Sequence, residues 1–180
     1  MERKRNLLIT GPPGSGKTTV IRRLLEALPQ GAVAGFYTEE IREGGRRTGF
    51  AAQVIGGPGI VLAQAPGSGR HRVGRYAVEV EALEEMVLRP LRLALKDPSK
   101  RFLVIDEIGK MELLAPSFAT MVLAFLDDPR PLVATVMAAS HPLVDRIKAR
   151  PDTQVIPLTA ANRDRLPLEL GKRLKELAGA

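Results

Sequence analysis

The chain contains no cysteine and no tryptophan, and its only histidines are His71 and His141. Without cysteine there can be neither a disulfide framework nor a zinc site built from thiolates. Two imidazoles argue against a metal centre made mainly of histidine, and also against a Ser/His/Asp catalytic triad. These absences remove several common kinds of enzyme site from consideration.

Long hydrophobic runs are also missing, because no stretch of 18 apolar residues could form a transmembrane helix. The basic start, MERKR, is followed by the apolar stretch NLLIT, which is too short for a signal peptide and leads straight into a glycine-rich loop. We therefore expect a cytoplasmic protein with no membrane association. Since the 180 residues are 44% hydrophobic and show no repeat, linker or low-complexity tract, we expect one domain spanning residues 1–180.

Negative charge is in deficit: the formal net charge is +7 and the pI is about 10.1. A basic surface attracts polyanions, so nucleotides or nucleic acids could be the partner. The ordinary alternative is that many arginines form ion-pair networks on a solvated surface, as in heat-adapted proteins. Charge alone does not choose between these interpretations.

Hydrophobic patterning alternates between short apolar runs and amphipathic stretches of helical period. Continuous apolar strands between helices predict an α/β fold, with a mostly parallel sheet covered by helices on both faces. The turn signal GGPG also predicts an inserted β-hairpin. Ligands of such sheets bind at the carboxyl ends of the strands. The predicted strands are 6–10, 32–38, 48–55, 59–65, 101–109, 131–139 and 153–159, and the predicted helices are 17–28, 78–95, 115–126, 141–150 and 167–177.

The stretch GPPGSGKTT, residues 11–19, follows the first predicted strand and opens the first predicted helix. Its spacing is that of a phosphate-binding loop, in which glycines let backbone N–H groups approach phosphate oxygens. Lys17 would reach the β- and γ-phosphate oxygens as a catalytic residue, Thr18 would bind Mg²⁺, and Thr19 would contact the α-phosphate. The predicted nucleotide-binding residues here are Gly11, Pro12, Pro13, Gly14, Ser15, Gly16, Lys17, Thr18 and Thr19.

Two adjacent acids, Asp106 and Glu107, end the apolar run FLVI. An aspartate at this place holds the Mg²⁺ of a bound nucleotide, and we expect that role for Asp106. Glu107 could orient and deprotonate a water in line with the γ-phosphate, as a catalytic base, although it could also cap a loop. Lys110 could contact a phosphate or lie free on the surface, and Glu112 suits the start of the next helix.

With the glycine loop, the blocks VIDEIGKMEL (104–113) and GFYTEEIREGGRRTGF (35–50) resemble a known family nearly end to end. This family comprises the small P-loop nucleoside-triphosphatases of thermophilic bacteria and archaea, related to the cancer-related nucleoside-triphosphatase of animals. The resemblance implies a RecA/nucleotide-kinase-like fold. It also implies slow, Mg²⁺-dependent hydrolysis of ATP, GTP, CTP and UTP with relaxed base choice. ATVMAASHP (134–142) departs from the pattern, in which a proline and polar residues are expected directly after the strand, and this leaves the γ-phosphate sensor open.

Several basic side chains remain open to two interpretations. Arg42, Arg46 and Arg47 could belong to a mobile loop that neutralises transition-state charge, or to a charged hairpin tip. Asn162 and Arg163 follow the last strand, where they could contact or stack on the base, or form a turn into the final helix. Arg146 and Arg150 are weaker candidates for arginine fingers, because such a spacing more often marks a solvated helix face.

Three functions compete at this point. The leading hypothesis is an enzyme that hydrolyses nucleoside triphosphates. A nucleotide or nucleoside kinase would need an acceptor pocket and a lid, which residues 38–76 could supply. An ATP-gated nucleic-acid-binding module would use the positive charge, but no nucleic-acid-binding motif accompanies it, so it is not favoured. We expect a monomer.

Overall fold

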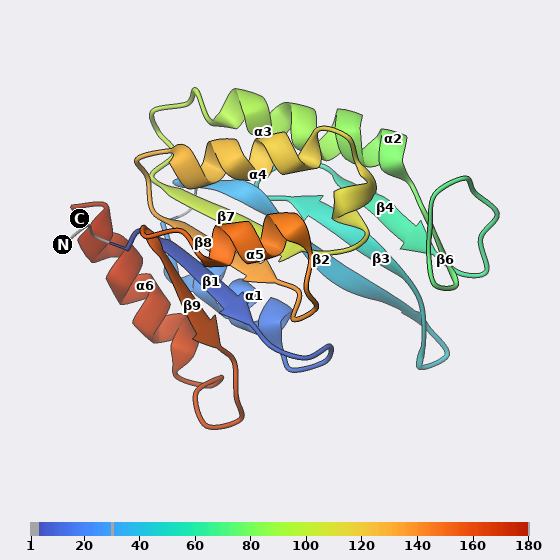
Figure 1. Ribbon diagram of the computed structural model, residues 1–180, viewed down its shortest axis with the longest axis horizontal. Helices are drawn as coiled ribbons and strands as arrows, with labels where there is room; N and C mark the ends of the chain where they lie inside the picture. The colour runs from blue at the N-terminus through green and yellow to red at the C-terminus, as the bar shows by residue number, and fades with distance from the viewer. Residues whose placement is uncertain (1–3, 30, 180) are drawn as a thin grey trace.

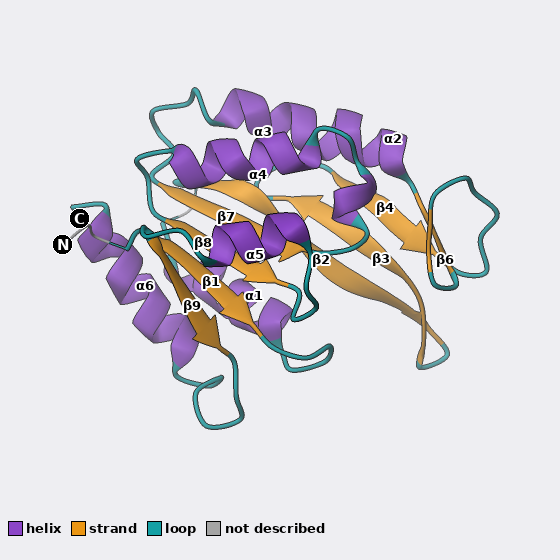
Figure 2. Ribbon diagram, viewed as in Figure 1, coloured by secondary structure: helices purple, strands orange, loops and turns teal. Residues whose placement is uncertain are grey.

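The structure is a computed structural model that describes residues 4–29 and 31–179. The described residues form one nine-stranded sheet with helices on both faces (Figures 1 and 2). The strands, in the spatial order β5-β6-β4-β3-β2-β7-β8-β1-β9, have the following bounds. They are β1 (Asn6–Thr10), β2 (Val33–Glu43), β3 (Arg46–Val54), β4 (Gly59–Gln64), β5 (Arg72–Val73), β6 (Tyr76–Val78), β7 (Phe102–Ile108), β8 (Leu132–Val136) and β9 (Thr153–Pro157).

Helical segments connect and cover these strands. In the described chain α1, α4, α5 and α6 are α-helices, whereas the helix between β6 and β7 is divided into α2, η1 and α3. η1 is π-helical and η2 is a 3₁₀ turn. The bounds are α1 (Lys17–Ala27), α2 (Val80–Leu83), η1 (Glu84–Leu88), α3 (Arg89–Ala94), η2 (Glu112–Leu114), α4 (Phe118–Asp127), α5 (Pro142–Lys148) and α6 (Leu166–Leu177).

Both faces of the parallel half of the sheet are buried, as the continuous apolar strands predict. In β1, Leu7 and Ile9 pack into one hydrophobic cluster with α1 and α6, whereas Leu8 packs into the other with α3 and α4. Side chains alternate between the faces of a strand, so a strand covered on both sides must be apolar throughout. The predicted fold class, a mostly parallel α/β sheet of the P-loop type, is confirmed.

The other half of the sheet is antiparallel and larger than the predicted hairpin. The hairpin formed by β3 and β4 is present, but β2 also continues past residue 38 and pairs antiparallel with β3. Gly44 and Gly45 make the turn between them, both at positive φ, a conformation that glycine adopts without strain. Residues 39–47 are therefore a two-stranded hairpin, not an irregular loop.

The predicted helix 78–95 is a continuous helical segment whose middle turn is π-helical. Pro90, the second residue of α3, lacks the N–H that an α-helical bond to this turn would use. At the start of α5, the His141 Nδ1 accepts a hydrogen bond from the Leu143 N–H at 3.2 Å, so this histidine is a helix cap. None of the helices in the described part of the chain has the length and apolarity to cross a bilayer.

Gly35 allows β2 to lie against β7 at the centre of the sheet. Its φ is +151°, and a Cβ added there would lie 1.8 Å from the carbonyl oxygen of Val104. No side chain can occupy that position without moving one of the two strands. The contact matters for function because β2 and β7 carry neighbouring parts of the site described below.

We predict that Gly35→Ala lowers the free energy of unfolding by about 3 kcal/mol or more, because the backbone must shift to relieve the clash. Gly171→Ala in α6 is the matched control: its Cβ would meet its nearest neighbour at 3.6 Å, an ordinary contact. In that helix alanine should be neutral or stabilise by up to about 1 kcal/mol. Urea denaturation of both variants measures the effects, and equal stabilities of Gly35→Ala and the wild type would contradict the prediction.

Candidate active site

The glycine loop joins the carboxyl end of β1 to α1. Gly14 and Gly16 have φ values of 76° and 97°, and no neighbouring atom lies within 4 Å of where their Cβ atoms would be. No side chain caps the first turn of α1, which begins at Lys17. The first N–H groups of the helix therefore have no side-chain partner and lie at its positive end, an arrangement that binds anions.

Lys17 is the charged group at the centre of the loop. Only 8% of the residue is exposed. Its Nζ donates hydrogen bonds to the carbonyls of Gly11 at 3.0 Å and Pro12 at 3.4 Å, and it lies 3.7 Å from Oε1 of Glu107. One buried ammonium thus connects the loop after β1 to the acid pair in β7.

Asp106 is buried beside the start of α1, with 1% of the residue exposed. Its carboxylate accepts hydrogen bonds from the Thr135 hydroxyl in β8 and, at 3.4 Å, from the Thr38 N–H in β2. The nearby Thr18 hydroxyl also favours the ionised form of this carboxyl. Burial raises the pKa of Asp106, although these donors and the charge of Lys17 act in the opposite direction.

Glu107 differs from its neighbour because its side chain is 30% exposed, toward the loop. Burial raises its pKa, the ammonium of Lys17 lowers it, and the charge of Asp106 raises it further. A carboxylate with a raised pKa is a stronger base than an ordinary one, which suits proton abstraction. The position of the Glu107 carboxylate would let it contact a water molecule beside a phosphate bound to the loop.

The loop and Glu107 line one cavity of about 750 Å³ at the carboxyl edge of the sheet. Figure 1 shows that the loop after β1 and the β2–β3 hairpin lie on the same side of the molecule. The structure thus brings together the residues that the sequence assigned to phosphate and metal binding. The lining includes Pro13, Gly14, Gly16, Lys17, Thr18, Thr19, Thr38, Arg42, Arg47 and Glu107.

The donor set at Asp106 fits magnesium. This ion prefers oxygen ligands, and here the hydroxyl of Thr18 lies near a buried carboxylate. The described residues contain no group of three or more His, Cys, Asp and Glu side chains that could hold a metal by themselves. Thr18 and Asp106 would therefore hold the ion together with phosphate oxygens and water, as expected for a nucleotide-bound metal.

The NTPase family model matches residues 6–170 of the chain. The chain belongs to this family. It is 44% identical over 164 residues to the nucleoside-triphosphatase THEP1 of Thermotoga petrophila, covering 91% of this chain and 89% of that protein. It is 38% identical over 175 residues to the cancer-related nucleoside-triphosphatase of Homo sapiens, covering 90% and 92% respectively. The resemblance inferred from the motifs is confirmed.

Solved structures match the fold over nearly its whole length. The crystal structure of THEP1 from the hyperthermophile Aquifex aeolicus aligns with a TM-score of 0.82 at 36% identity, covering 94% of this chain and 99% of that one. The solution structure of a human cancer-related nucleoside triphosphatase aligns with a TM-score of 0.78, also at 36% identity, covering 96% and 98%. The antiparallel part of the sheet therefore lies within the length shared with the solved members of the NTPase family.

The remaining predicted site residues of this NTPase lie at the margins of the loop. Lys110 is exposed and lines a second cavity with Lys17 and Glu107. Arg163 lines a separate hollow of about 260 Å³ with Thr19 and other loop residues. In contrast, Asn162 is used in the turn itself: its Oδ1 accepts from the Thr159 N–H at 2.8 Å, and its Nδ2 donates to the Pro157 carbonyl at 2.9 Å. This is the structural role that the sequence left open for Asn162.

Thr38 and Thr135, which donate to Asp106, were missed by sequence reasoning. The signal for Thr135 was present, since a threonine interrupts the apolar strand LVATV, and it is fully buried. A buried hydroxyl needs a hydrogen-bond partner, so the carboxylate at the end of the adjacent strand could have been predicted as the acceptor for Thr135. Thr38 acts through its backbone N–H, which side-chain patterns do not reveal.

The hairpin arginines are held by their neighbours. Arg47 donates to the Tyr76 hydroxyl at 3.0 Å and to Glu40 at 2.8 Å, and its guanidinium lies 5.0 Å from the Phe50 ring centre. Glu40 also accepts from Arg42, and these two arginines lower the pKa of its carboxyl. Arg42 and Arg47 therefore line the cavity in a fixed arrangement on the hairpin.

Arg150, by contrast, lies at the opposite edge of the sheet. It forms ion pairs with Asp127 and Asp152 at 2.9 Å. Asp152 directly precedes β9, and its carbonyl accepts from the N–H of Asn6 at the start of β1. An arginine at the amino ends of the strands is remote from the glycine loop, so it is not placed to act as a finger.

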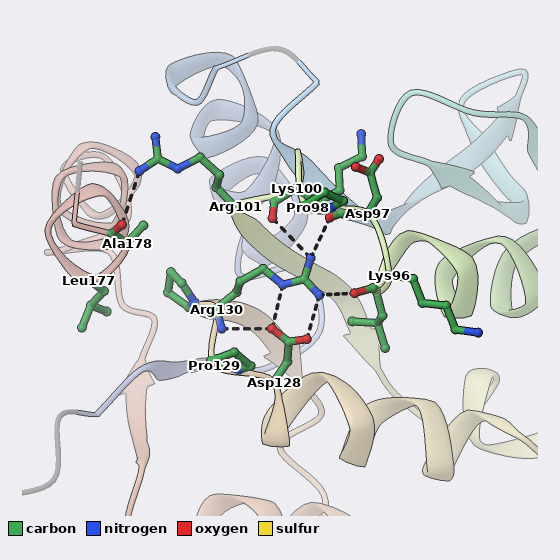
Figure 3. A pocket seen from close by; sticks show the side chains of 12 residues that line it. Lys96, Asp97, Pro98, Lys100, Arg101, Asp128, Pro129, Arg130, Leu177 and Ala178 are labelled. Carbon is green, nitrogen blue, oxygen red and sulfur yellow. Dashed lines mark hydrogen bonds and ion pairs between the residues drawn. The ribbon is translucent and has the colours of Figure 1, made fainter.

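A hollow of about 580 Å³ also lies at this amino edge, next to the amino ends of β7 and β8 (Figure 3). Its central arginine, Arg130, is fully engaged: it pairs with Asp128 and donates to the carbonyls of Leu95, Asp97 and Lys100. With its hydrogen-bonding groups used this way, the guanidinium ties the ends of the strands together and has little left to offer a ligand.

Glu112 departs from its expected role as a charged group at a helix start. It begins the short η2 turn, but only 5% of the residue is exposed, and burial raises its pKa to about 8. The negative charges of Glu107 and Asp106 act in the same direction. At neutral pH the carboxyl is therefore mostly protonated.

This raised pKa predicts a dependence of stability on pH. The unfolded chain ionises Glu112 near its ordinary pKa of 4.5, whereas the folded protein retains the proton up to about pH 8. The free energy of unfolding therefore falls as the pH rises between these values. Glu112→Gln, which is always uncharged, should reduce this fall by about 3 kcal/mol.

Urea denaturation at pH 5 and pH 8 measures this difference. Glu81→Gln, at an exposed position of α2, is the control and should keep the wild-type dependence. If Glu112→Gln and the wild type lost equal stability between the two pH values, the carboxyl of Glu112 would not be held in its protonated form.

Proposed function

We propose that this protein hydrolyses nucleoside triphosphates to diphosphates and inorganic phosphate, with Mg²⁺ as cofactor. The observation that carries the proposal is the buried Lys17 ammonium, 3.7 Å from the Glu107 carboxylate at the mouth of the glycine loop. The relatives named nucleoside-triphosphatase support hydrolysis over phosphoryl transfer or nucleic-acid binding.

Binding begins with the backbone N–H groups of residues 14–18, at the amino end of α1, which neutralise the phosphate oxygens. Lys17 exchanges its carbonyl partners for the β- and γ-phosphate oxygens. Thr18 and Asp106 would hold Mg²⁺, which would supply positive charge to the phosphate groups. The site thereby stabilises the charge that develops on the transferred phosphoryl group.

Glu107 acts as the base. A water molecule attacks the γ-phosphorus and passes a proton to the Glu107 carboxylate, while the bond from the γ-phosphorus to the bridging oxygen breaks. The products are the nucleoside diphosphate and phosphate. The raised pKa of Glu107 favours this transfer, and Lys17 keeps the carboxylate in position.

Relaxed base choice is the second part of the proposal. Arg163 and Thr19 line the same hollow. Thr19 follows Thr18, the proposed Mg²⁺ ligand, and would contact the α-phosphate. A guanidinium plane stacks on any base without reading its edges. ATP, GTP, CTP and UTP would then bind with similar affinity. We further propose that the protein is a cytoplasmic monomer of one domain.

Glu107→Gln tests the base. We predict that it binds Mg-ATP within a few-fold of the wild-type affinity but releases phosphate about 100-fold more slowly, since the amide cannot accept the proton. Calorimetry and a phosphate-release assay measure the two properties. Glu81→Gln serves again as the control with wild-type turnover. A Glu107→Gln protein that turns over normally would exclude this residue as the base.

Arg163→Ala tests the stacking role. We predict that it raises KM about five-fold for all four nucleoside triphosphates, with little change in kcat, because the lost contact does not change during the reaction. The control is Arg165→Ala, two residues along, whose side chain pairs with Glu169 on the surface. Unchanged KM values, or a change for only one base, would contradict a non-selective contact.

A further inference from the structure

Next to the triphosphate site lies a second cavity, of about 380 Å³, which hydrolysis does not account for. It shares Gly11, Lys17 and Glu107 with the active site, so it opens on the side where the γ-phosphate would lie. A single attacking water occupies about 30 Å³, less than a tenth of this volume. The remaining space is large enough for a small organic molecule.

The walls of this cavity are mainly apolar and come from elements far apart in the sequence. Phe50 lies on β3, Leu62 on β4 and Val73 on β5, while Met111 and Met137 follow β7 and β8. Aromatic rings and thioethers make favourable contacts with flat rings. Lys17 and Lys110 also line this cavity, but Lys17 is already paired with Glu107 and Lys110 is exposed to solvent. Burying a further charge among the apolar groups would be unfavourable, so an uncharged ligand is favoured.

Glu112 supplies a polar group to this apolar space. Its Oε2 lies 3.0 Å from where a Cβ of Gly109 would be, and the Cγ of Glu107 lies 3.5 Å from the same point. The two acidic side chains therefore flank Gly109 on the cavity wall. A protonated carboxyl can donate one hydrogen bond to an acceptor on a ligand.

We propose that this cavity binds an uncharged heteroaromatic molecule of one or two rings, and that the bound molecule inhibits hydrolysis by excluding water from Glu107. The proposal rests on the proposed function, because it places the γ-phosphate at the mouth of the cavity. It adds a regulatory ligand site to the triphosphate site. The two cavities adjoin and share lining residues such as Phe50, Val73 and Met111. The inhibitor would occupy the part lined by Leu62, Glu112 and Met137, so nucleotide and inhibitor would bind together.

Steady-state kinetics with defined probes test this. The probes are nicotinamide, quinoxaline and caffeine, and nicotinate is the charged counterpart of nicotinamide. At saturating Mg-ATP we expect at least one uncharged probe, at millimolar concentration, to lower kcat about five-fold with KM changed less than about two-fold. Nicotinate should have no effect. No inhibition by any of the three up to about 10 mM, or a raised KM instead of a lowered kcat, would overturn the proposal.

A pair of phenylalanine variants locates the binding. Ala138→Phe would fill part of the cavity from the segment after β8, at a residue that does not line the triphosphate cavity, whereas Val61→Phe adds bulk on the exposed side of β4. Both should hydrolyse ATP at the wild-type rate. Inhibition should need about ten-fold more probe in Ala138→Phe and be unchanged in Val61→Phe. Equal inhibition of both variants would place the probe elsewhere.

Calorimetry separates this proposal from the proposed function. The three uncharged probes are titrated into wild-type protein saturated with Mg²⁺ and a non-hydrolysable ATP analogue, so binding is measured without turnover. Heat from at least one uncharged probe, but none from nicotinate, supports the cavity as a binding site even if Glu107 proved not to be the base. No heat from any of the three would overturn the site even if hydrolysis itself proceeds as proposed.

Discussion

The position of one positive charge, the ammonium of Lys17, is the constraint on which the site depends. The group is nearly excluded from water, and its hydrogen bonds to loop carbonyls and its proximity to Glu107 compensate for that burial. The same contacts join the loop after β1 to the end of β7, although β8 lies between these strands. In the proposed mechanism a triphosphate supplies oxygens that replace these carbonyls, so the charge that organises the loop would also bind substrate.

Around this charge the sheet supplies a desolvated carboxylate and a more exposed one from adjacent residues. Asp106 is surrounded by hydroxyl and N–H donors from β2, β8 and α1, which suits a metal ligand. Glu107 lies toward the cavity, which suits a base. The different surroundings of the two carboxylates suit them to different roles. This arrangement needs β2 and β7 in close contact, and Gly35 makes that contact sterically possible.

Much of this could be predicted from the sequence, because the parts concerned are local. The apolar runs predicted the parallel strands, and the spacing of Gly11, Gly16 and Lys17 predicted the phosphate-binding loop. The extension of β2 to Glu43 was missed because its charged residues pair across the hairpin instead of entering the core. The burial of Glu112 and the donors to Asp106 depend on contacts between distant strands, which patterns along one segment do not report. The role of Asn162 was left open for the same reason.

The most direct test of the central claim is a crystal structure with ADP, Mg²⁺ and aluminium fluoride, a mimic of the phosphoryl group in transfer. The account predicts the mimic between Lys17 Nζ and the Glu107 carboxylate, with the metal between Thr18 and Asp106. Nucleotide bound at the amino edge of the sheet, or a mimic whose attacking water lies out of reach of Glu107, would contradict it.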